Sequence, residues 1–208
     1  RNRVLRLGSM VERAIQDSVK SLVEGKSDLA KKVIKRDQQI NALDIEIDKE
    51  SIRLLSLGPP KARDLRFIVT TLKITTDIER MGDLAVNIAE RAIELNKEPQ
   101  LKPYIDIPRM AEIVQEMVGD SLDAYVKGCT SLPYKVLKME NEIDKLMEQV
   151  FNELLFFMIQ DPRTASRAIR IISVAKYLER IADHATNVAE MVIYMCEGKL
   201  VRHVVVTE

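Results

Sequence analysis

One long motif occurs twice in the sequence, and this repeat constrains the fold more than any other feature. Residues 75–91 read TTDIERMGDLAVNIAER and residues 175–191 read AKYLERIADHATNVAEM, so both contain E-R-x-x-D-x-x-x-N-x-A-E at an offset of 100 positions. Upstream, residues 7–43 match residues 110–146 at an offset of 103 positions. We therefore interpret the 208-residue chain as two copies of one unit of about 100 residues, the size of a small domain.

Breaker residues divide each copy into three helical segments, whereas strand-like alternation occurs only in the tail at residues 204–206. The predicted helices span residues 3–24, 28–57, 62–96, 108–127, 131–159 and 162–197. Short connections make neighbouring helices antiparallel, which predicts an all-α fold of two tandem pseudo-symmetric three-helix bundles. The predicted organisation is a first bundle at 1–97, a linker at 98–107, a second bundle at 108–199 and a C-terminal tail at 200–208.

The third helix of each copy carries one apolar face that follows alternating steps of four and three residues. This spacing is typical of a helix-packing seam, so we expect these residues to form the core, with the methionines as gap fillers rather than ligands. The seam consists of Phe67, Thr71, Ile74, Ile78, Met81, Ala85, Ile88, Ala92 and Leu95 in the first copy, and of Ile171, Val174, Leu178, Ile181, Ala185, Val188, Val192 and Met195 in the second.

Charge and composition exclude several functional classes. Lys and Arg together number 32, as do Asp and Glu, so the chain lacks the positive field of a nucleic-acid-binding protein. No apolar run approaches the roughly 20 residues that span a bilayer, and the N-terminus does not resemble a secretory signal. Cys129 and Cys196 form no C-x-x-C pair, so we expect reduced thiols. These features predict a soluble cytoplasmic protein, and the helical pattern at Arg1 suggests that residues precede it.

The acidic residues of the repeated motif lie on the helix face opposite the seam. At about 100° per residue, Glu79, Asp83, Asn87 and Glu90 form one stripe that faces away from the bundle's own core. We therefore expect exposed carboxylates without an apolar pocket that would raise their pKa, which argues against buried general-acid chemistry. Carboxylates one helical turn apart can, however, share a hard metal ion.

The second helix of each copy offers further oxygen ligands on one face. Antiparallel packing would bring them beside Glu79 and Asp83 in the first copy and beside Glu179 and Asp183 in the second, which predicts two acid clusters that could hold metal. The alternative is that all are ordinary solvated charges. These second-helix residues are Asp37, Asn41, Asp44 and Asp48 in the first copy, and Glu140, Asp144 and Glu148 in the second.

Other catalytic signals are weak. The two histidines, His184 and His203, do not form the Glu-x-x-His pattern of ferritin-like di-iron bundles, so a ferritin-type oxidase is not favoured. We interpret His184 as a surface histidine, although its neighbour Asp183 leaves open that it assists a ligand. The sequence contains no glycine-rich phosphate loop, G-x-S-x-G or catalytic Cys-His pattern. We therefore expect a protein that is not an enzyme.

Several motifs together resemble the PhoU family over essentially the whole chain. They are the doubled [LI]-E-R-[IM]-[GA]-D-x-x-x-N-[IV]-A-E, the residues Pro60, Asp64, Leu65 and Arg66 at the start of a third helix, the stretch Asp161-Pro162-Arg163-Thr164, and the closing Gly198, Arg202 and His203. The resemblance implies a regulator of phosphate uptake and of the phosphate-starvation (Pho) response. It implies a negative regulator that couples the ATPase subunit of a phosphate ABC transporter to a sensor histidine kinase, and acts in the cytoplasm, peripheral to the inner membrane, as a homodimer.

The resemblance also implies multinuclear metal clusters, of iron or of zinc, manganese, magnesium or calcium. The matching ligands are Glu79 with Asp83 and Glu179 with Asp183, with Asp44, Asp48, Glu140 and Asp144 as partners and Asp37, Asn87, Asn187 and Glu148 as accessory candidates. The two copies differ in the second helix: Asn41 stands where Asp144 does, and Met147 and Phe151 stand where Asp44 and Asp48 do.

Two alternatives to a metal-binding adaptor follow from the same residues. One is a carboxylate-bridged metalloenzyme or a metal-storage bundle. The other is an adaptor without metal, whose acidic faces dock on basic patches of its partners and would bind them in a salt-dependent manner.

Overall fold

The computed structural model describes residues 1–58, 60–199 and 201, and in this part of the chain every element is a helix, with no strand. The elements are α1 (Asn2–Val23), α2 (Ser27–Ser56), α3 (Ala62–Leu95), α4 (Asp106–Lys127), α5 (Ser131–Gln160), the 3-10 helix η1 (Pro162–Thr164) and α6 (Ala165–Glu197). The all-α prediction is confirmed. Apart from Lys199 and Val201, the residues after Gly198, including Arg202, His203 and the run 204–206, lie outside the described residues.

Two of the helix boundaries have clear local causes. Both α4 and α6 end at a glycine in the left-handed conformation, Gly128 with φ 65° and Gly198 with φ 72°, which only glycine adopts without strain. The third helix of the second copy does not begin at Pro162 as predicted, because Asp161 accepts a hydrogen bond from the Arg163 amide at 3.1 Å and forms a 3-10 turn. The α-helix therefore starts at Ala165.

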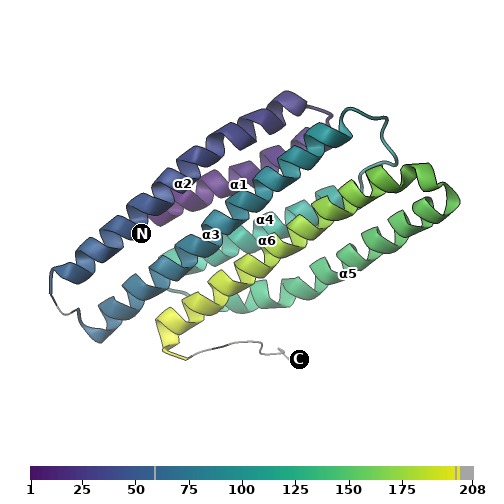
Figure 1. The fold of residues 1–208 in the computed structure, drawn as a ribbon. Helices are drawn as coiled ribbons and strands as arrows, with labels where there is room; N and C mark the ends of the chain where they lie inside the picture. Colours follow the sequence, from purple (N-terminus) through teal and green to yellow (C-terminus); the bar gives the residue numbers. More distant parts are fainter. Residues whose placement is uncertain (59, 200, 202–208) are drawn as a thin grey trace.

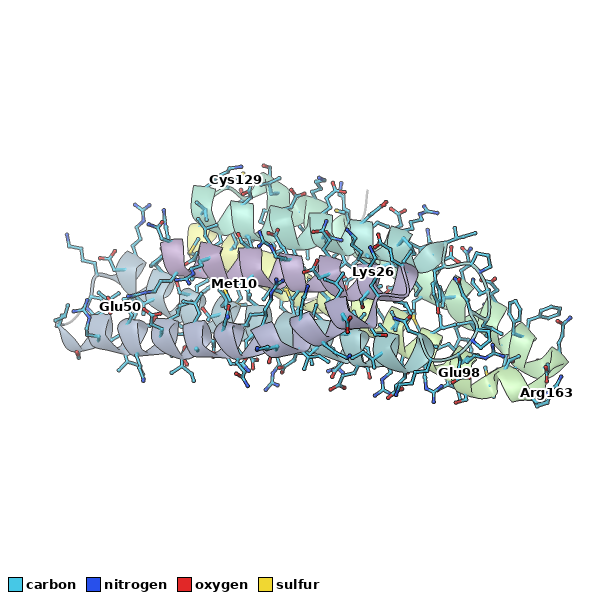
Figure 2. All side chains as sticks on the ribbon, turned by 90° about the horizontal axis from the view of Figure 1, so that it is seen from above. Met10, Lys26, Glu50, Glu98, Cys129 and Arg163 are labelled. Carbon is cyan, nitrogen blue, oxygen red and sulfur yellow. The ribbon has the colours of Figure 1, made fainter. Side chains whose placement is uncertain are left out.

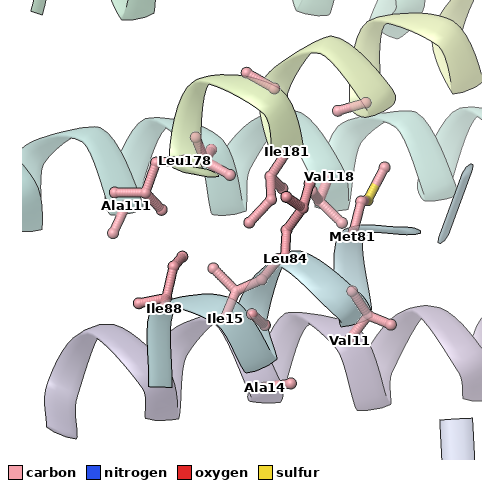
Figure 3. Close-up of a cluster of buried hydrophobic side chains, with 14 of the residues drawn as sticks. Val11, Ala14, Ile15, Met81, Leu84, Ile88, Ala111, Val118, Leu178 and Ile181 are labelled. Atoms are coloured by element: carbon pink, nitrogen blue, oxygen red, sulfur yellow. The ribbon is translucent and has the colours of Figure 1, made fainter. Parts of the chain in front are cut away.

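The two three-helix bundles share one hydrophobic core. Figure 1 shows α3 and α6 side by side in the middle of the molecule, with α2 and α5 on the outside, and α3 packs on α6 while α1 packs on α4. Figure 3 shows the meeting point, where Val11 and Ile15 of α1 face Leu84 of α3, Val118 of α4 and Ile181 of α6. Both copies of the repeat therefore contribute to a single apolar cluster.

The predicted seam is buried along its length except at Phe67 and Met195, which are half-buried. Ile74 and Ile78 are fully buried. Phe67 stacks on the buried ring of Tyr125 in α4, with the ring centroids 5.8 Å apart. The Phe67 end of the first seam therefore packs against the other copy.

Two helical hairpins extend past the shared core at opposite ends of the molecule. Figure 2 shows the α2–α3 hairpin beyond Glu50 at one end and the α5–α6 hairpin, which contains Arg163, at the other. Both tips carry exposed apolar side chains, which include Ile52, Leu57 and Leu65 on the first and Phe156, Ile159 and Ile169 on the second. None of the described helices combines the length and the apolar character that crossing a membrane requires.

Candidate functional site: two acid clusters

Four carboxylates of α2 and α3 gather in the first repeat, and we call Asp37, Asp44, Glu79 and Asp83 the first acid cluster. Burial raises the pKa of Glu79, and the negative charges of Asp83, Asp44 and Asp37 raise it further, against the opposite effect of Arg80. Burial and the charge of Asp83 also raise the pKa of Asp37. The cluster thus contains more negative charge than its surroundings neutralise.

Two oxygen atoms at the inner edge of this cluster lack partners among the described residues. Asn41 Nδ2 donates a hydrogen bond to Asp37 Oδ2 at 3.0 Å, but Asp37 Oδ1 and Asn41 Oδ1 are buried and make no hydrogen bond within that part of the chain. Gly82 on α3 lets Ile40 of α2 pack closely, since a Cβ there would lie 3.3 Å from Ile40 Cγ2, and Asp37 Oδ1 lies next to the same position, at 3.7 Å. Buried oxygens of this kind are suited to a cation or an ordered water.

One cation lies over the outer edge of the first acid cluster. Arg80 Nη1 lies 3.1 Å from Asp83 Oδ2, and Arg80 Nε lies 3.7 Å from Glu79 Oε2. Arg80 therefore neutralises the two motif carboxylates only in part, and it occupies the position that a bound cation would approach.

The second acid cluster consists of Asp144 on α5 with Glu179 and Asp183 on α6. Burial and the charge of Glu179 raise the pKa of Asp183 and of Asp144. Lys176 forms an ion pair with Glu179, one turn before it on α6. Glu140 lines the same open cavity as Asp183, with a volume of about 680 Å³, so it faces this cluster too.

The expectation that the motif carboxylates are exposed holds for Asp183 and Glu90 and is wrong for Glu79 and Glu179. The expectation that burial does not raise their pKa is wrong for Glu79 and Asp183. The side chains of Glu79 and Glu179 are only 22% and 18% exposed, and burial is the first cause of the raised pKa of Glu79. The physical reason is that the outer helices α2 and α5 pack along α3 and α6 and cover the edges of these stripes. The side chains lie away from the shared core but inside the grooves between helices.

Some candidate residues do not join a cluster. Asp48 lies beside Asp44, whose pKa it helps to raise, but unlike Asp44 it is not among the charges that raise the pKa of Glu79. Glu148 is exposed, and within the described part of the chain neither it nor the half-buried Asn87 makes a hydrogen bond or salt bridge to a cluster.

A contact that the sequence did not reveal lies between the two repeats. His184 is half-buried rather than a free surface histidine, and its Nδ1 lies 2.8 Å from Asp77 Oδ1 on α3. Asn187 Nδ2 donates to the same oxygen at 3.3 Å. Tyr177 stands at the position of Asp77 in the second repeat, so Asp77 is not part of the repeated motif and the comparison of the repeats did not identify it.

The donor chemistry of both clusters fits a hard cation, because all their ligating atoms are oxygens. Asp37 Oδ1 of the first cluster and the neighbouring Asn41 Oδ1 are, in addition, buried without a hydrogen-bond partner among the described residues. Among residues 1–58, 60–199 and 201, however, no three His, Cys, Asp or Glu side chains are grouped so that they could hold a metal ion as they stand. Metal binding would therefore require carboxylates to turn toward one another and the Arg80 and Lys176 ion pairs to yield.

Comparisons with known proteins agree with the fold and the repeat. The sequence model of the PhoU domain matches residues 4–92 and again residues 107–192. The chain is 43% identical over 203 residues to the phosphate-specific transport system accessory protein PhoU homolog of Aquifex aeolicus, which covers 98% of this chain and 92% of that protein. It is 38% identical over 208 residues to the homolog of the same name from Pseudomonas aeruginosa, covering 100% and 86% of the two chains.

Solved structures give the same result. The crystal structure of PhoU from Pseudomonas aeruginosa matches with a TM-score of 0.93 and 38% identity over 96% of each chain. The structure of the phosphate transport system regulatory protein PhoU from Streptococcus pneumoniae matches with a TM-score of 0.90 and 27% identity over 97% of this chain and 95% of that one. The resemblance inferred from the doubled motif is thereby confirmed, and the chain belongs to the PhoU family.

Proposed function

We propose that this protein is a regulatory accessory protein of a phosphate-specific transport system. The names of its relatives support this role, since homologs at 43% and 38% identity are accessory proteins of that system. In this proposal the protein is a cytoplasmic, non-enzymatic adaptor that contacts the ATPase subunit of a phosphate ABC transporter and a sensor histidine kinase. It acts as a negative regulator that holds the kinase in its non-signalling state when phosphate is plentiful.

The observation that carries the adaptor role is the crowding of carboxylates in two clusters, one per repeat, of which the second faces an open cavity. Burial and mutual repulsion raise the pKa of Glu79 and Asp183, so an approaching positive charge would be stabilised at either cluster. The exposed apolar tips, which include Leu57 and Ile159, add contact area of the kind that helical adaptors use. Two similar surfaces on one rigid molecule suit a protein that contacts two partners.

We further propose that each acid cluster binds metal, as a multinuclear cluster of iron or of zinc, manganese, magnesium or calcium. Glu79, Asp83, Asp37 and Asp44 would hold it in the first repeat, and Glu179, Asp183, Asp144 and Glu140 in the second. The metal would supply positive charge that neutralises the crowded carboxylates and fixes α2 against α3 and α5 against α6. In this proposal the metal has a structural and electrostatic role and does not act on a substrate.

The adaptor proposal is tested by binding of the purified protein to the ATPase subunit and to the cytoplasmic part of the kinase. We expect saturable binding to each, weakened by the double variant Asp83→Asn, Asp183→Asn and unchanged by Glu112→Gln, an exposed acid on α4. Failure to bind either partner would contradict the proposal. Sedimentation of the same samples tests the homodimer.

The metal proposal is tested by elemental analysis of protein purified without an affinity tag. We expect several equivalents of metal per chain in the wild type and a large loss in the Asp83→Ala, Asp183→Ala double variant. A wild-type protein that lacks metal yet binds both partners would assign the carboxylates to docking alone. Strong salt dependence of that binding, with no effect of chelator, would support the same assignment.

A further inference from the structure

A cavity separate from both acid clusters lies at the end of the molecule where α1 and α3 begin and where α4 and α6 end. Its volume is about 720 Å³, and we call it the basic cavity. Cys129, labelled in Figure 2, follows α4 at this end. The lining residues are Arg1, Arg63, Arg66 and Lys127, with Asp64, Phe67, Gly128, Met195 and Cys196.

Most of the cationic side chains in the basic cavity form no ion pair with another described residue. Within the described residues, Arg63 and Arg66 make no salt bridge or hydrogen bond, and Arg66 Nε is buried without a partner. Arg1 contacts a carbonyl, Val126 O, at 3.4 Å, and lies over the Phe67 ring, but it meets no carboxylate there. Three guanidinium groups therefore surround a space in which Asp64 is the only acidic residue among the described residues that line it.

Helix dipoles do not account for this excess of cations. Cations at helix C-termini offset the partial negative charge of the last carbonyl groups, and α4 and α6 both end here. However, α3 begins at the same end, so its N-terminal partial positive charge opposes that effect. Lys127, in the last turn of α4, is already paired with Asp123 at 2.6 Å. The net charge of the cavity therefore comes from the arginines.

The corresponding end of the second repeat provides an internal comparison. There Arg163 pairs with Asp161 at 2.9 Å, and Arg167 donates to Pro99 O at 2.8 Å and lies 3.7 Å from Glu98. Arg163 and Arg167 at that end therefore already contact acceptors of this chain. Three positions of the basic cavity have uncharged or acidic counterparts: Ser166 replaces Arg66, Glu24 replaces Lys127 and Tyr104 replaces Arg1.

We infer that the basic cavity binds an oxyanion of the phosphate type that carries two or more negative charges. Each guanidinium presents a planar fork of donors that matches two oxygens of such an anion, and several forks around one space favour a tetrahedral group over a single carboxylate. The buried Arg66 Nε lacks an acceptor that the anion would supply. Free orthophosphate, pyrophosphate and the phosphate groups of a nucleotide share this chemistry.

This inference is independent of the acid clusters and of the adaptor role, and calorimetry tests it. Orthophosphate, pyrophosphate and ADP are titrated into the full chain with EDTA present, at constant ionic strength, so that metal-bridged binding at the acid clusters does not contribute. We expect saturable binding of at least one of them, weakened about tenfold in Arg63→Gln and in Arg66→Gln. ADP binding tighter than pyrophosphate would identify a nucleotide as the source, and the reverse order an inorganic anion.

The internal comparison supplies the control. Arg163→Gln, at the corresponding position of the other end, should leave binding unchanged. Because Arg66 packs against Gly198, its replacement could disturb the end of α6, so circular dichroism and the exposed Arg63→Gln variant separate misfolding from lost binding. Absence of saturable binding for all three anions, or equal weakening in Arg163→Gln, would overturn the inference.

Discussion

Asp77 on α3 accepts a hydrogen bond from His184 Nδ1 on α6 at a distance of 2.8 Å. The contact joins the two repeats outside the shared apolar core, and Asn187 Nδ2 on α6 reinforces it at 3.3 Å. The equivalent contact between the repeats does not exist, because Tyr177 stands at the position that corresponds to Asp77 and Leu84 at the position that corresponds to His184. One side of the α3–α6 pair is thus held by a polar contact.

We expect this contact to contribute measurably to stability. Asp77→Ala and His184→Ala should each lower the free energy of unfolding by about 1 kcal/mol, since each removes a half-buried hydrogen bond. The double variant should lose about 0.5–1 kcal/mol less than the sum, because the two side chains form one interaction. Urea unfolding measures all three. Asn87→Ala, the counterpart of Asn187, should show no such coupling with His184→Ala, and strict additivity of Asp77 and His184 would contradict the prediction.

Arg80 should compete with cations for the first acid cluster. Arg80→Gln is expected to tighten binding of a divalent cation by roughly threefold, since an exposed ion pair contributes up to about 1 kcal/mol. Competition with a fluorescent metal indicator measures the change. Arg180→Gln is the matched control, because Arg180 occupies the same motif position while Lys176 makes the ion pair with Glu179. Weaker cation binding by Arg80→Gln would exclude this competition.

Glu12 should make stability depend on pH. Burial against α4 and then the charge of Asp123 raise its pKa above the ordinary value of 4.5, so the folded state binds a proton at a pH where the unfolded state has lost it. Stability therefore falls as pH rises from about 4.5 through the folded pKa, and the full cost is present above that pKa.

Glu12→Gln should consequently raise the free energy of unfolding at pH 7, on the order of 0.5 kcal/mol, and this gain should disappear as the pH falls below the ordinary value. Urea unfolding at a series of pH values measures it, with the exposed Glu112→Gln as control. A gain that persists unchanged at low pH would show that the carboxylate charge is not its cause.

Two helical glycines should respond in opposite ways to alanine. A Cβ at Gly8 on α1 would clash with the buried Leu122 side chain of α4, so Gly8→Ala should lower the free energy of unfolding by about 1 kcal/mol. A Cβ at Gly119 on α4 would meet only Glu12 Oε1 at 3.3 Å, the end of a flexible side chain. Gly119→Ala should therefore raise stability by up to about 1 kcal/mol through helix propensity. Thermal unfolding compares the two variants.

The fold could be predicted because the period of the apolar residues and the positions of the breaker residues indicate the same helices. The seam that runs from Ile74 to Ala92 has the period of a helix, and the breakers at Gly25, Gly58 and Gly128 stand where the helices end. The sequence did not indicate that the two bundles share a core. Phe67 has the spacing of a seam residue, yet its ring stacks on Tyr125 of the other repeat. Periodicity identifies an apolar helix face but not the helix that covers it.

The candidate site was predictable only in part. The spacing of Glu79 and Asp83 identified the motif face, and the matching periodicity of Asp37 and Asp44 brought α2 into the first cluster. The degree of burial was not predictable, since it depends on how closely the outer helices pack. Asp77 and Lys176 were missed for another reason: Tyr177 and Thr76 occupy their counterpart positions, and a search guided by repetition overlooks residues that break it.

The core shared by α3 and α6 has a consequence for either repeat on its own. Separated from its companion, one repeat would expose the apolar side of its third helix to water, including residues such as Ile78 or Ile181 that lie in the common cluster. A second copy of the same repeat, placed about a two-fold axis, would cover that surface with nearly the same side chains. A single repeat is therefore expected to persist as a self-associated pair, and the chain contains within one polypeptide the arrangement that such a pair would have.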